Sequence, residues 1–386
     1  MRIGFSVLLA LAVIPNVVAQ PSSTFTLPDV AQHQIDALFS EFDSLTSPGY
    51  AIGIAKGETV LYTHGYGSAN LDYQLPITPS SAFSIASVSK QFTAACVALL
   101  ILEGSLTLDD PAQTYIPELA KYEAYPRIRI KHLIYNTSGL TDYHRLPRRD
   151  GKSWITFNYF DVDESLSYAL AEDTLLFAPG EQWDYVNVNF MLLAKIVEQV
   201  SGQRFATFAR ERLFEPLGMD DTLIHDDITA VVPNRVTPYN LRTPDNIEGY
   251  ARYGVQVNAE GDYMQHHRNA PHYGGSGVVT TINDLMRWSI NMVTHDFGGQ
   301  AFFDLMHRTE AFQHDRTNQA FGLYWGDFNG RPIVAWDGGD WGISSQLMRF
   351  PDQGVAIAVL SNLGSGEAFR KVNAIADVLT EHGILE

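Results

Sequence analysis

Ser87-Val88-Ser89-Lys90 is the most informative stretch of this chain. A serine three residues before a lysine lies on the same helix face, about one turn away. Of the seven lysines, only Lys90 has a serine at this offset. A serine hydroxyl needs a neighbouring base to accept its proton, and burial lowers a lysine pKa enough for the amine to do so. The spacing therefore predicts Ser87 as a nucleophile and Lys90 as its base. Because Ser-x-x-Lys also arises by chance, the case depends on other segments.

The composition is that of a globular protein with a large core. The chain has 386 residues, of which 45% are hydrophobic and 18% are charged. Its 26 basic and 44 acidic residues give a formal net charge of -18, which argues against a nucleic-acid partner and disfavours polyanionic ligands. Cys96 is the only cysteine, so no intrachain disulfide can form, and its apolar neighbours predict a buried thiol.

Residues 1–19 have the pattern of a secretory signal peptide. Arg2 supplies the positive start, residues 5–14 the apolar centre, and Val17-Val18-Ala19 the small-residue cleavage site. The apolar stretch is short for a bilayer span, and no cysteine follows it for lipid attachment. We expect cleavage near Ala19 and an exported mature chain, periplasmic or secreted, with no integral membrane segment.

Strand patterns lie at both ends of the chain. Near the start, residues 50–55 and 59–65 flank a Lys-Gly turn, and near the end residues 344–350 and 355–362 flank a Pro-Asp-Gln-Gly turn. Helical patterns occupy residues 29–45, 89–103, 189–200 and 282–293. We therefore predict an α/β (α+β) fold, in which an antiparallel sheet from both chain ends is flanked by helices and carries an inserted helical domain.

This fold predicts one catalytic domain over residues 20–386. Residues 20–86 and 305–386 are expected to form its sheet-containing part, and residues 87–304 the mainly helical insertion. The active-site cleft would lie at their junction. Residues 143–158 and 226–272 are rich in Pro, Gly, Asn and Asp, so we expect irregular loops that wall the cleft.

A second candidate element is Tyr185-Val186-Asn187. Among 18 tyrosines, Tyr185 is the only one followed two positions later by asparagine. A phenol near the serine could pass a proton between nucleophile, lysine and leaving group, and the Asn187 amide could hold either the lysine or a substrate carbonyl. Beside Trp183, the tyrosine could instead serve in packing.

A third candidate element is Trp336-Asp337-Gly338-Gly339, which we expect directly before a strand that begins near Gly342. Glycines let backbone N–H groups approach a bound carbonyl closely. The N–H groups of Ser87 and Gly339 could together form an oxyanion hole. Alternatively, the glycines belong to a turn or bulge and serve backbone geometry alone.

Together these segments resemble the serine β-lactamase-related hydrolases, a family that includes class C β-lactamases, penicillin-binding DD-carboxypeptidases, D-aminopeptidases and esterases. Residues 85–94 (IASVSKQFTA) resemble the active-site serine motif of this family. Further similar stretches are NTSGL at 136–140, LFEPLGM at 213–219 and YGGSGVVTTINDLMRW at 273–288. The resemblance runs from about residue 31 to 365, and it implies a serine β-lactamase-like fold that uses no metal and no organic cofactor.

By this resemblance, Ser87 matches the acylated nucleophile and Lys90 the base beside it. Tyr185 and Asn187 match the Tyr-x-Asn motif of the class C-like branch, in which the identity of the base in each step is unsettled. The three motifs follow the order found in the family. The resemblance therefore implies that Ser87, Lys90 and Tyr185 are the catalytic residues.

The chain departs from the family at the third motif. By the resemblance, many members carry Lys-Thr-Gly or His-x-Gly there, which gives a cation or an imidazole that meets a substrate carboxylate. Trp336 stands at that position, and Asp337 adds a negative charge, so anionic substrates should bind weakly. A tryptophan there resembles the esterase and acyltransferase members. We expect Asn187, Trp336, Gly338 and Gly339 to bind the substrate.

The expected function is an exported serine hydrolase that cleaves small esters through a Ser87 acyl-enzyme. One alternative is a D-amino-acid-directed peptidase (a DD-carboxypeptidase or D-aminopeptidase) or a weak class C-like β-lactamase. An alternative from another class is a non-catalytic, penicillin-recognising binding or sensor protein. The expected partner is a small-molecule ester, amide or peptide, and the sequence leaves the oligomeric state and the acyl chain length open.

Some polar clusters suggest sites that we do not expect. His266, His267 and His272 match no common zinc spacing, so we expect them in a loop that borders the cleft, where one could contact substrate. The arginines within residues 145–149 should lie on a solvated loop rather than bind phosphate. Ser138 should support the site, and Ser89 lacks a lysine at the required offset.

Overall fold

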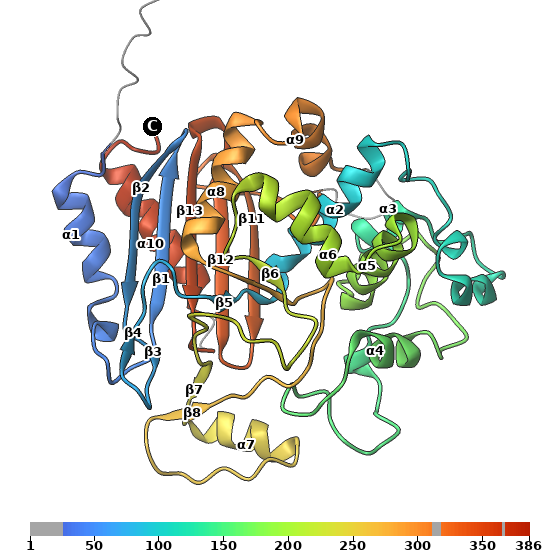
Figure 1. The fold of residues 1–386 in the computed structure, drawn as a ribbon, viewed down its shortest axis with the longest axis horizontal. Coiled ribbons are helices and arrows are strands. Elements are labelled where there is room, and N and C mark those ends of the chain that lie inside the picture. Colours follow the sequence, from blue (N-terminus) through green and yellow to red (C-terminus); the bar gives the residue numbers. More distant parts are fainter. Residues whose placement is uncertain (1–25, 311–317, 365–366) are drawn as a thin grey trace, which may run out of the picture.

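The computed structural model describes residues 26–310, 318–364 and 367–386, so the predicted signal peptide lies outside the described residues. A six-stranded antiparallel sheet in the order β10-β11-β12-β13-β1-β2 forms the centre of the molecule (Figure 1). Its strands are β1 (Tyr50–Lys56), β2 (Thr59–Tyr66), β10 (Tyr324–Phe328), β11 (Arg331–Asp340), β12 (Ile343–Phe350) and β13 (Val355–Ser361). The predicted antiparallel sheet from the two chain ends is confirmed.

Helices cover both faces of this sheet. α1 (Asp29–Ala37) and α10 (Ala368–Glu381) pack on one face, and α8 (Ile282–Thr294) packs on the other. α1 is shorter than the predicted 29–45 helix, since a separate turn follows it. α8 falls inside the range predicted for the helical insertion, yet it contacts β1, β2 and β13. The sheet-containing part therefore also includes residues 282–294.

Strand β1 explains why α8 belongs to the sheet. Its larger side chains, such as Tyr50 and Ile52, belong to the core beneath α1 and α10. The opposite face presents Ala51, Gly53 and Ala55, and an added Cβ on Gly53 would lie 2.8 Å from the side chain of Ile282 in α8. Small residues on that face let the helix approach the strand closely.

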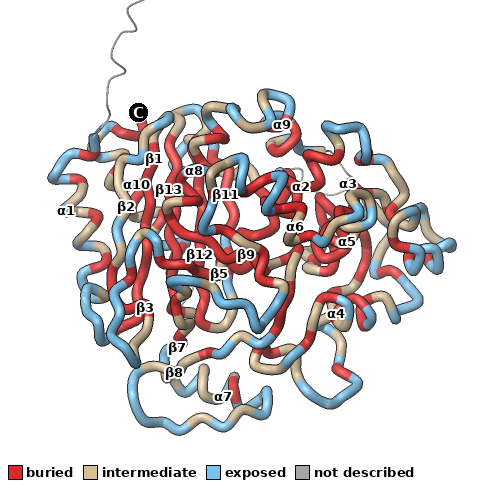
Figure 2. Tube along the Cα trace, viewed as in Figure 1, coloured by how far each residue is buried: buried red, intermediate tan, exposed pale blue. Residues whose placement is uncertain are grey.

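The helical region surrounds α2 (Lys90–Leu102), in which every residue from Lys90 to Leu100 is buried (Figure 2). A helix that is apolar on all sides belongs inside a core, and α2 contacts neighbouring helices on several sides. Cys96 is fully buried there, as expected. The other helices of this region are α3 (Ile130–Ile134), α4 (Val162–Ala169), α5 (Asn187–Ser201), α6 (Phe205–Ala209) and α9 (Gly299–His307). Within the described residues, no helix combines the length and hydropathy needed to cross a bilayer.

Short elements connect the two regions. The sequence predicted an irregular loop at 226–272, but the structure forms a hairpin and a helix there, because Thr243 caps the helix by accepting a hydrogen bond from Asn246 N. The short strands and this helix are β3 (Ser68–Asn70), β4 (Leu75–Pro76), β5 (Phe83–Ser84), β6 (Leu223–Ile224), β7 (Tyr239–Leu241), α7 (Pro244–Arg252), β8 (Tyr263–Gln265) and β9 (Val278–Thr280). The short 3₁₀ and π-helical elements are η1 (Ser40–Phe42), η2 (Ala86–Ser89), η3 (Ala112–Thr114), η4 (Pro117–Tyr122), η5 (Tyr143–Arg145), η6 (Arg210–Phe214), η7 (Glu215–Leu217) and η8 (Pro351–Gln353).

Candidate active site

Ser87 lies on the short turn η2, between β5 and α2. The preceding Ala86 has φ +44°, in the left-handed region that residues with a side chain rarely adopt. Ser87 is half-buried, whereas Val88 and Lys90 are buried. The strained turn therefore presents the Ser87 side chain at the wall of a cavity while its neighbours are held in the core.

Lys90 lies one turn beyond Ser87, as the spacing predicted. Its Nζ is 3.1 Å from Ser87 Oγ, and it donates hydrogen bonds to Asn187 Oδ1 at 2.8 Å and to the carbonyl of Gly275 at 2.6 Å. A neutral amine has two N–H groups and one lone pair. With its two donors on Asn187 and Gly275, the neutral Lys90 can turn its lone pair toward Ser87 Oγ.

Burial makes that neutral form accessible near neutral pH. Lys90 is fully buried, and desolvation lowers its pKa to about 7. The negative charges of Asp142 and Asp337 act in the opposite direction and limit this decrease. Both protonation states of Lys90 are therefore populated near pH 7, as a reversible proton acceptor requires.

Tyr185 completes the cluster around the serine. Its hydroxyl lies 2.7 Å from Ser87 Oγ, and Lys90 Nζ lies 4.8 Å from its ring centroid. Burial raises the pKa of Tyr185 well above its usual value, while the hydrogen bond with Ser87 lowers it to a smaller extent. Tyr185 is therefore a protonated phenol, suited to relaying a proton between neighbouring oxygen and nitrogen atoms.

Asn187 and Asp142 hold the lysine in place. Asn187 is the first residue of α5, and both its backbone N and its side-chain Nδ2 donate to Asp142 Oδ2, at 2.7 and 3.0 Å. The amide oxygen of Asn187 is thereby left to face Lys90. Of the two roles predicted for Asn187, the structure shows the contact with the lysine. Asp142 was not predicted from the sequence, although it lies two residues after the NTSGL segment.

The NTSGL segment at 136–140 fixes the approach to Tyr185. Ser138 donates to Asn189 Oδ1 at 2.6 Å, Asn136 accepts from Asn189 Nδ2 at 3.0 Å, and the Asn136 carbonyl accepts from Asp184 N. The expected supporting role of Ser138 agrees with these contacts. Ser89, in contrast, accepts a hydrogen bond from the buried backbone N of residue 278 and is not directed at the cavity.

The third motif lies on a strand of its own. Residues 336–339 belong to β11, which pairs with β12 from Val334 to Asp340, and the strand predicted to begin near Gly342 is β12, which begins at Ile343. A Cβ on Gly338 would lie 2.4 Å from the Ile85 carbonyl and 3.0 Å from Ser87 N, so glycine is needed there for close backbone approach. A Cβ on Gly339 would meet no atom within 4 Å. Gly339 therefore faces open space beside Ser87.

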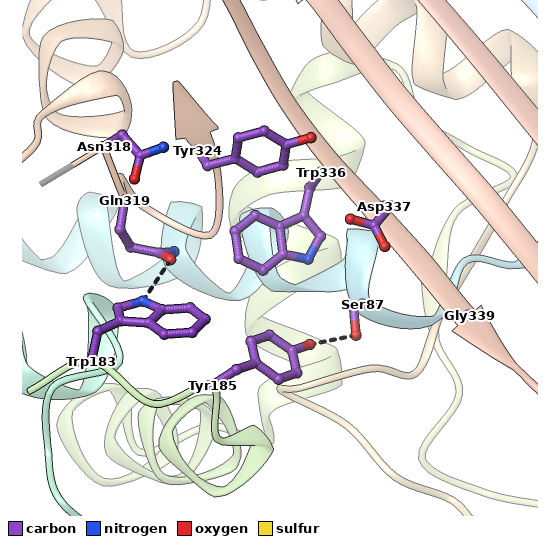
Figure 3. Close-up of a pocket in the computed structure, with 9 residues that line it drawn as sticks. All are labelled: Ser87, Trp183, Tyr185, Asn318, Gln319, Tyr324, Trp336, Asp337 and Gly339. Atoms are coloured by element: carbon purple, nitrogen blue, oxygen red, sulfur yellow. Dashed lines mark hydrogen bonds between the residues drawn. The ribbon is translucent and has the colours of Figure 1, made fainter. Parts of the chain in front are cut away.

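Two cavities meet at Ser87, Tyr185 and Gly339. The larger, of about 730 Å³, has aromatic walls that include Trp336, with Asp337 beside them (Figure 3). Trp336 packs against the Tyr185 ring at a centroid distance of 6.1 Å. The predicted aromatic wall and added negative charge at the third motif are thus both found at this cavity.

The smaller cavity, of about 230 Å³, is polar. It includes Arg268, which forms an ion pair with Asp340 and a 3.4 Å hydrogen bond to Ser276 Oγ. Tyr143 and His272 also line it, so the segment beginning at residue 143 walls the cleft as expected. An acyl compound attacked by Ser87 can thus place one part in an aromatic cavity and the other in a polar one.

The histidine cluster does not converge. His266 bonds to Thr156 Oγ1 and Tyr250 OH, whereas His272 bonds to Ser165 Oγ and Tyr143 OH. Burial lowers the pKa of both rings, to about 4 for His266 and about 3 for His272, so both are neutral. Within the described part of the chain, no group of three or more His, Cys, Asp or Glu side chains is placed to hold a metal ion.

The basic run at 145–149 is not wholly solvated, which corrects the prediction. The side chain of Arg148 is only 2% exposed. It pairs with Asp150 and Glu164, at 2.7 and 2.9 Å, and its guanidinium lies 4.7 Å from the Trp154 ring centroid. A planar cation can be buried when carboxylates and an aromatic face replace water. Arg148 therefore belongs to the structure of the cleft wall.

An antiparallel sheet flanked by helices, with a Ser-x-x-Lys turn and a Tyr-x-Asn segment meeting beside β11, places the chain in the superfamily of serine β-lactamases and penicillin-binding proteins. The chain belongs to the Beta-lactamase family, whose model matches residues 35–382. The family resemblance inferred from the sequence is confirmed.

The curated relatives include penicillin-binding proteins and D-aminopeptidases. A penicillin-binding protein of Bacillus subtilis is 30% identical over 332 residues, which are 80% of this chain and 66% of the relative. A D-aminopeptidase of Gluconobacter oxydans is 30% identical over 242 residues, which are 62% of this chain and 41% of the relative. The chain thus spans less than two thirds of the length of both relatives.

Solved structures show the same fold at lower identity. A D-amino acid amidase from Ochrobactrum anthropi SV3, complexed with D-phenylalanine, has a TM-score of 0.75 at 19% identity, over 91% of this chain and 99% of that one. The octameric penicillin-binding protein homologue from Pyrococcus abyssi has a TM-score of 0.72 at 22% identity, over 92% and 77% of the two chains. The serine β-lactamase-like fold predicted from the sequence is confirmed.

Proposed function

We propose that this protein is a serine hydrolase that cleaves small esters through an acyl-enzyme on Ser87. The observation that carries the proposal is the position of Ser87 Oγ, which lies 3.1 Å from Lys90 Nζ and 2.7 Å from Tyr185 OH. A hydroxyl between an amine of lowered pKa and a protonated phenol has both a proton acceptor and a proton relay within reach. A protein that only binds ligands would not need these three groups to converge, which disfavours the sensor alternative.

In the acylation step, Ser87 Oγ attacks the ester carbonyl carbon while neutral Lys90 accepts the serine proton. Tyr185 then gives its proton to the leaving alkoxide and regains one from Lys90, so the alcohol departs neutral. The backbone N–H groups of Ser87 and Gly339 would stabilise the oxyanion, at about 2.7–4 kcal/mol per donor. The close approach of Gly338 to Ser87 N supports this arrangement.

In the deacylation step, water takes the place of the alcohol. The Tyr185 and Lys90 pair accepts a proton from the water as it attacks the acyl carbon, and Ser87 leaves with a proton from the same pair. The two steps use the same groups in opposite directions. The products are the carboxylic acid, the alcohol and regenerated enzyme, with no metal or organic cofactor.

The third motif supports esters over carboxylate-bearing substrates. Trp336 and Asp337 place an aromatic ring and a carboxylate at the larger cavity. A substrate carboxylate there would meet the negative charge of Asp337. This unfavourable contact disfavours β-lactams and peptides with a free C-terminus.

A D-amino-acid amide or peptide is the second candidate substrate. D-Aminopeptidases are among the curated relatives, and a D-amino acid amidase shares the fold. The leaving amine of an amide requires protonation, which Tyr185 could supply. Because Asp337 would not repel a free ammonium group, the third motif is compatible with this candidate.

The deciding experiment compares five substrates with wild type and Ser87→Ala. Fast turnover of p-nitrophenyl acetate and butyrate, with a Ser87 acyl adduct in intact mass spectra, supports the ester proposal. Turnover of D-alanine p-nitroanilide but not its L-isomer, without ester turnover, favours the second candidate, and turnover of nitrocefin alone favours a β-lactamase. Absence of turnover and of any adduct would contradict the proposal.

Export after cleavage near Ala19 is also proposed, and the N-terminal sequence of the secreted protein tests it.

A further inference from the structure

The larger cavity beside Ser87 has a composition that ester cleavage alone does not require. Its aromatic lining comprises Trp183, Tyr185, Tyr324 and Trp336. Asp337 is its carboxylate, and among the described residues that line it none is cationic (Figure 3). Aromatic faces with one carboxylate form a surface that favours a positive charge.

Asp337 has no partner that neutralises it among the residues that the structure describes. It is exposed on β11, where it has neither an ion pair nor a hydrogen bond of its side chain within that part of the chain. The charge of Asp337 raises the pKa of the buried Lys90, but the lysine amine already forms hydrogen bonds with Ser87, Asn187 and Gly275. A cation that enters the cavity would therefore meet an unpaired carboxylate.

The aromatic rings adjoin this carboxylate rather than lying apart from it. Trp336 directly precedes Asp337 on β11, and its ring lies 5.8 Å from the Tyr324 centroid and 6.1 Å from the Tyr185 centroid. A ring face attracts an ammonium group, and the attraction is stronger when water is excluded from the contact. The net charge of -18 adds a field that draws cations toward the protein.

We propose that this cavity binds an ammonium group of the substrate, so that the preferred substrates are acyl compounds with a positive charge beside the scissile bond. The inference rests on the proposed Ser87 hydrolase and names its substrate class. Asp337 supplies the opposite charge, and the aromatic walls around Trp336 replace the water that the ammonium group loses on entry. Quaternary and primary ammonium groups share this chemistry.

Two matched substrate pairs test the proposal, one for each side of the scissile bond. Acetylthiocholine and 3,3-dimethylbutyl thioacetate differ only by nitrogen or carbon at the branched centre of the leaving group. D-Alanine p-nitroanilide and isobutyryl p-nitroanilide differ by an ammonium or a methyl group on the acyl side. For each pair, the ratio of kcat/KM for the charged member to that for the neutral member is measured at one pH.

The ratio is then compared between wild type and Asp337→Asn. A change in Lys90 protonation affects both members of a pair, and the difference in intrinsic reactivity between the two members is the same for both enzymes. Both effects therefore cancel when the ratios of the two enzymes are compared. We expect the ratio to fall about fivefold or more for at least one pair, because the charged member loses the attraction of a carboxylate a few ångströms away and the neutral member does not. The pair that responds identifies the side of the bond that enters the cavity.

Two further variants sharpen the result. Asp352→Asn removes one charge from the η8 turn, outside the cavity lining, and should leave both ratios unchanged. Tyr324→Leu removes an aromatic face and should lower the ratio of the responding pair. Ratios unaffected by Asp337→Asn in both pairs would overturn the proposal while leaving ester hydrolysis intact. Absence of turnover with all four substrates and with p-nitrophenyl acetate would overturn the proposed function as well.

Discussion

Asp142 Oδ2 accepts two hydrogen bonds from the same residue, one from the backbone N of Asn187 and one from its side-chain Nδ2. This fully buried carboxylate thereby sets which end of the Asn187 amide faces Lys90. Asp142 touches none of the reacting atoms, so its part is that of a positioning residue. Its negative charge also raises the pKa of Lys90 against the larger effect of desolvation.

Asp142→Asn should therefore change both the rate and its pH dependence. We expect kcat to fall about 10-fold to 100-fold, as for other groups that orient a catalytic residue. With the carboxylate charge removed, the Lys90 pKa should decrease, so the acidic limb of the kcat/KM profile should move to lower pH. Asp163→Asn, which alters an exposed partner of Lys195, is the control. A rate loss without any movement of the limb would mean that Asp142 acts on stability alone.

The wild-type pH profile should report the lysine directly. Burial lowers the Lys90 pKa to about 7, and the neutral amine is the proton acceptor. For a neutral ester, kcat/KM should rise as pH increases through about 7 and level off above it. Stopped-flow or initial-rate measurements from pH 5 to 9 would check this. A limb near pH 10 would show that Lys90 keeps its ordinary pKa.

The same lowered pKa affects folding. Lys90 binds a proton less readily in the folded state than in the unfolded chain, whose lysines have a pKa of about 10.4. The cost of burying this residue is full below about pH 7, and it disappears as pH rises through the window between the two pKa values. The free energy of unfolding of wild type should thus increase relative to Lys90→Met between about pH 7 and 10. Chemical denaturation at a series of pH values measures this difference in the free energy of unfolding. A difference between the two proteins that stays constant from pH 7 to 10 would contradict the prediction.

Tyr185→Phe should have an effect that depends on the leaving group. The phenol gives its proton to the departing oxygen, which an alkoxide needs and a p-nitrophenolate does not. The loss in kcat/KM should therefore be larger for ethyl butyrate than for p-nitrophenyl butyrate, by about tenfold or more. The phenyl ring can still pack against Trp336, so thermal unfolding should be little changed. Equal losses for both esters would assign Tyr185 to acceptance of the serine proton instead.

The two glycines of β11 form a matched pair for stability. In Gly338→Ala the new methyl group would overlap the Ile85 carbonyl and Ser345 Oγ, at 2.4 and 2.5 Å. We expect a loss of about 1–3 kcal/mol in the free energy of unfolding. Gly339→Ala meets no atom within 4 Å and should change stability by about 0.5 kcal/mol or less. Equal effects would show that β11 and Ser87 are less closely packed than the structure indicates.

The contacts that could be predicted from the sequence are those between residues close together in the chain. The Ser87 to Lys90 spacing is set by one helical turn, so their contact followed from the sequence alone. The contact of Asp142 with Asn187 did not, because it joins residues 45 positions apart through a loop whose path the sequence does not define. Arg148 was expected in solvent, since nothing local reveals that Glu164 and an aromatic ring would receive its charge.

The sequence predicted the strand that follows the third motif but not the strand that carries it. Gly338 and Gly339 interrupt the apolar pattern of β11, so only the later strand β12 was expected. The physical reason for glycine is tertiary, since the strand must approach the turn that carries Ser87. Glycine usually weakens or ends a strand, but Gly338 lets β11 approach the backbone N of Ser87 closely.

The pairing of β1 with β13 has a consequence for how the molecule is made. Tyr50 is matched with Ser361, so β1, which pairs with β2 on one edge, gains a partner on its other edge only after almost all of the polypeptide has been synthesised. Contacts between such distant residues slow folding and leave unpaired strand edges exposed for longer. The nascent chain should depend on chaperones until its last strands emerge, and a truncation before β13 should aggregate rather than yield a smaller working enzyme.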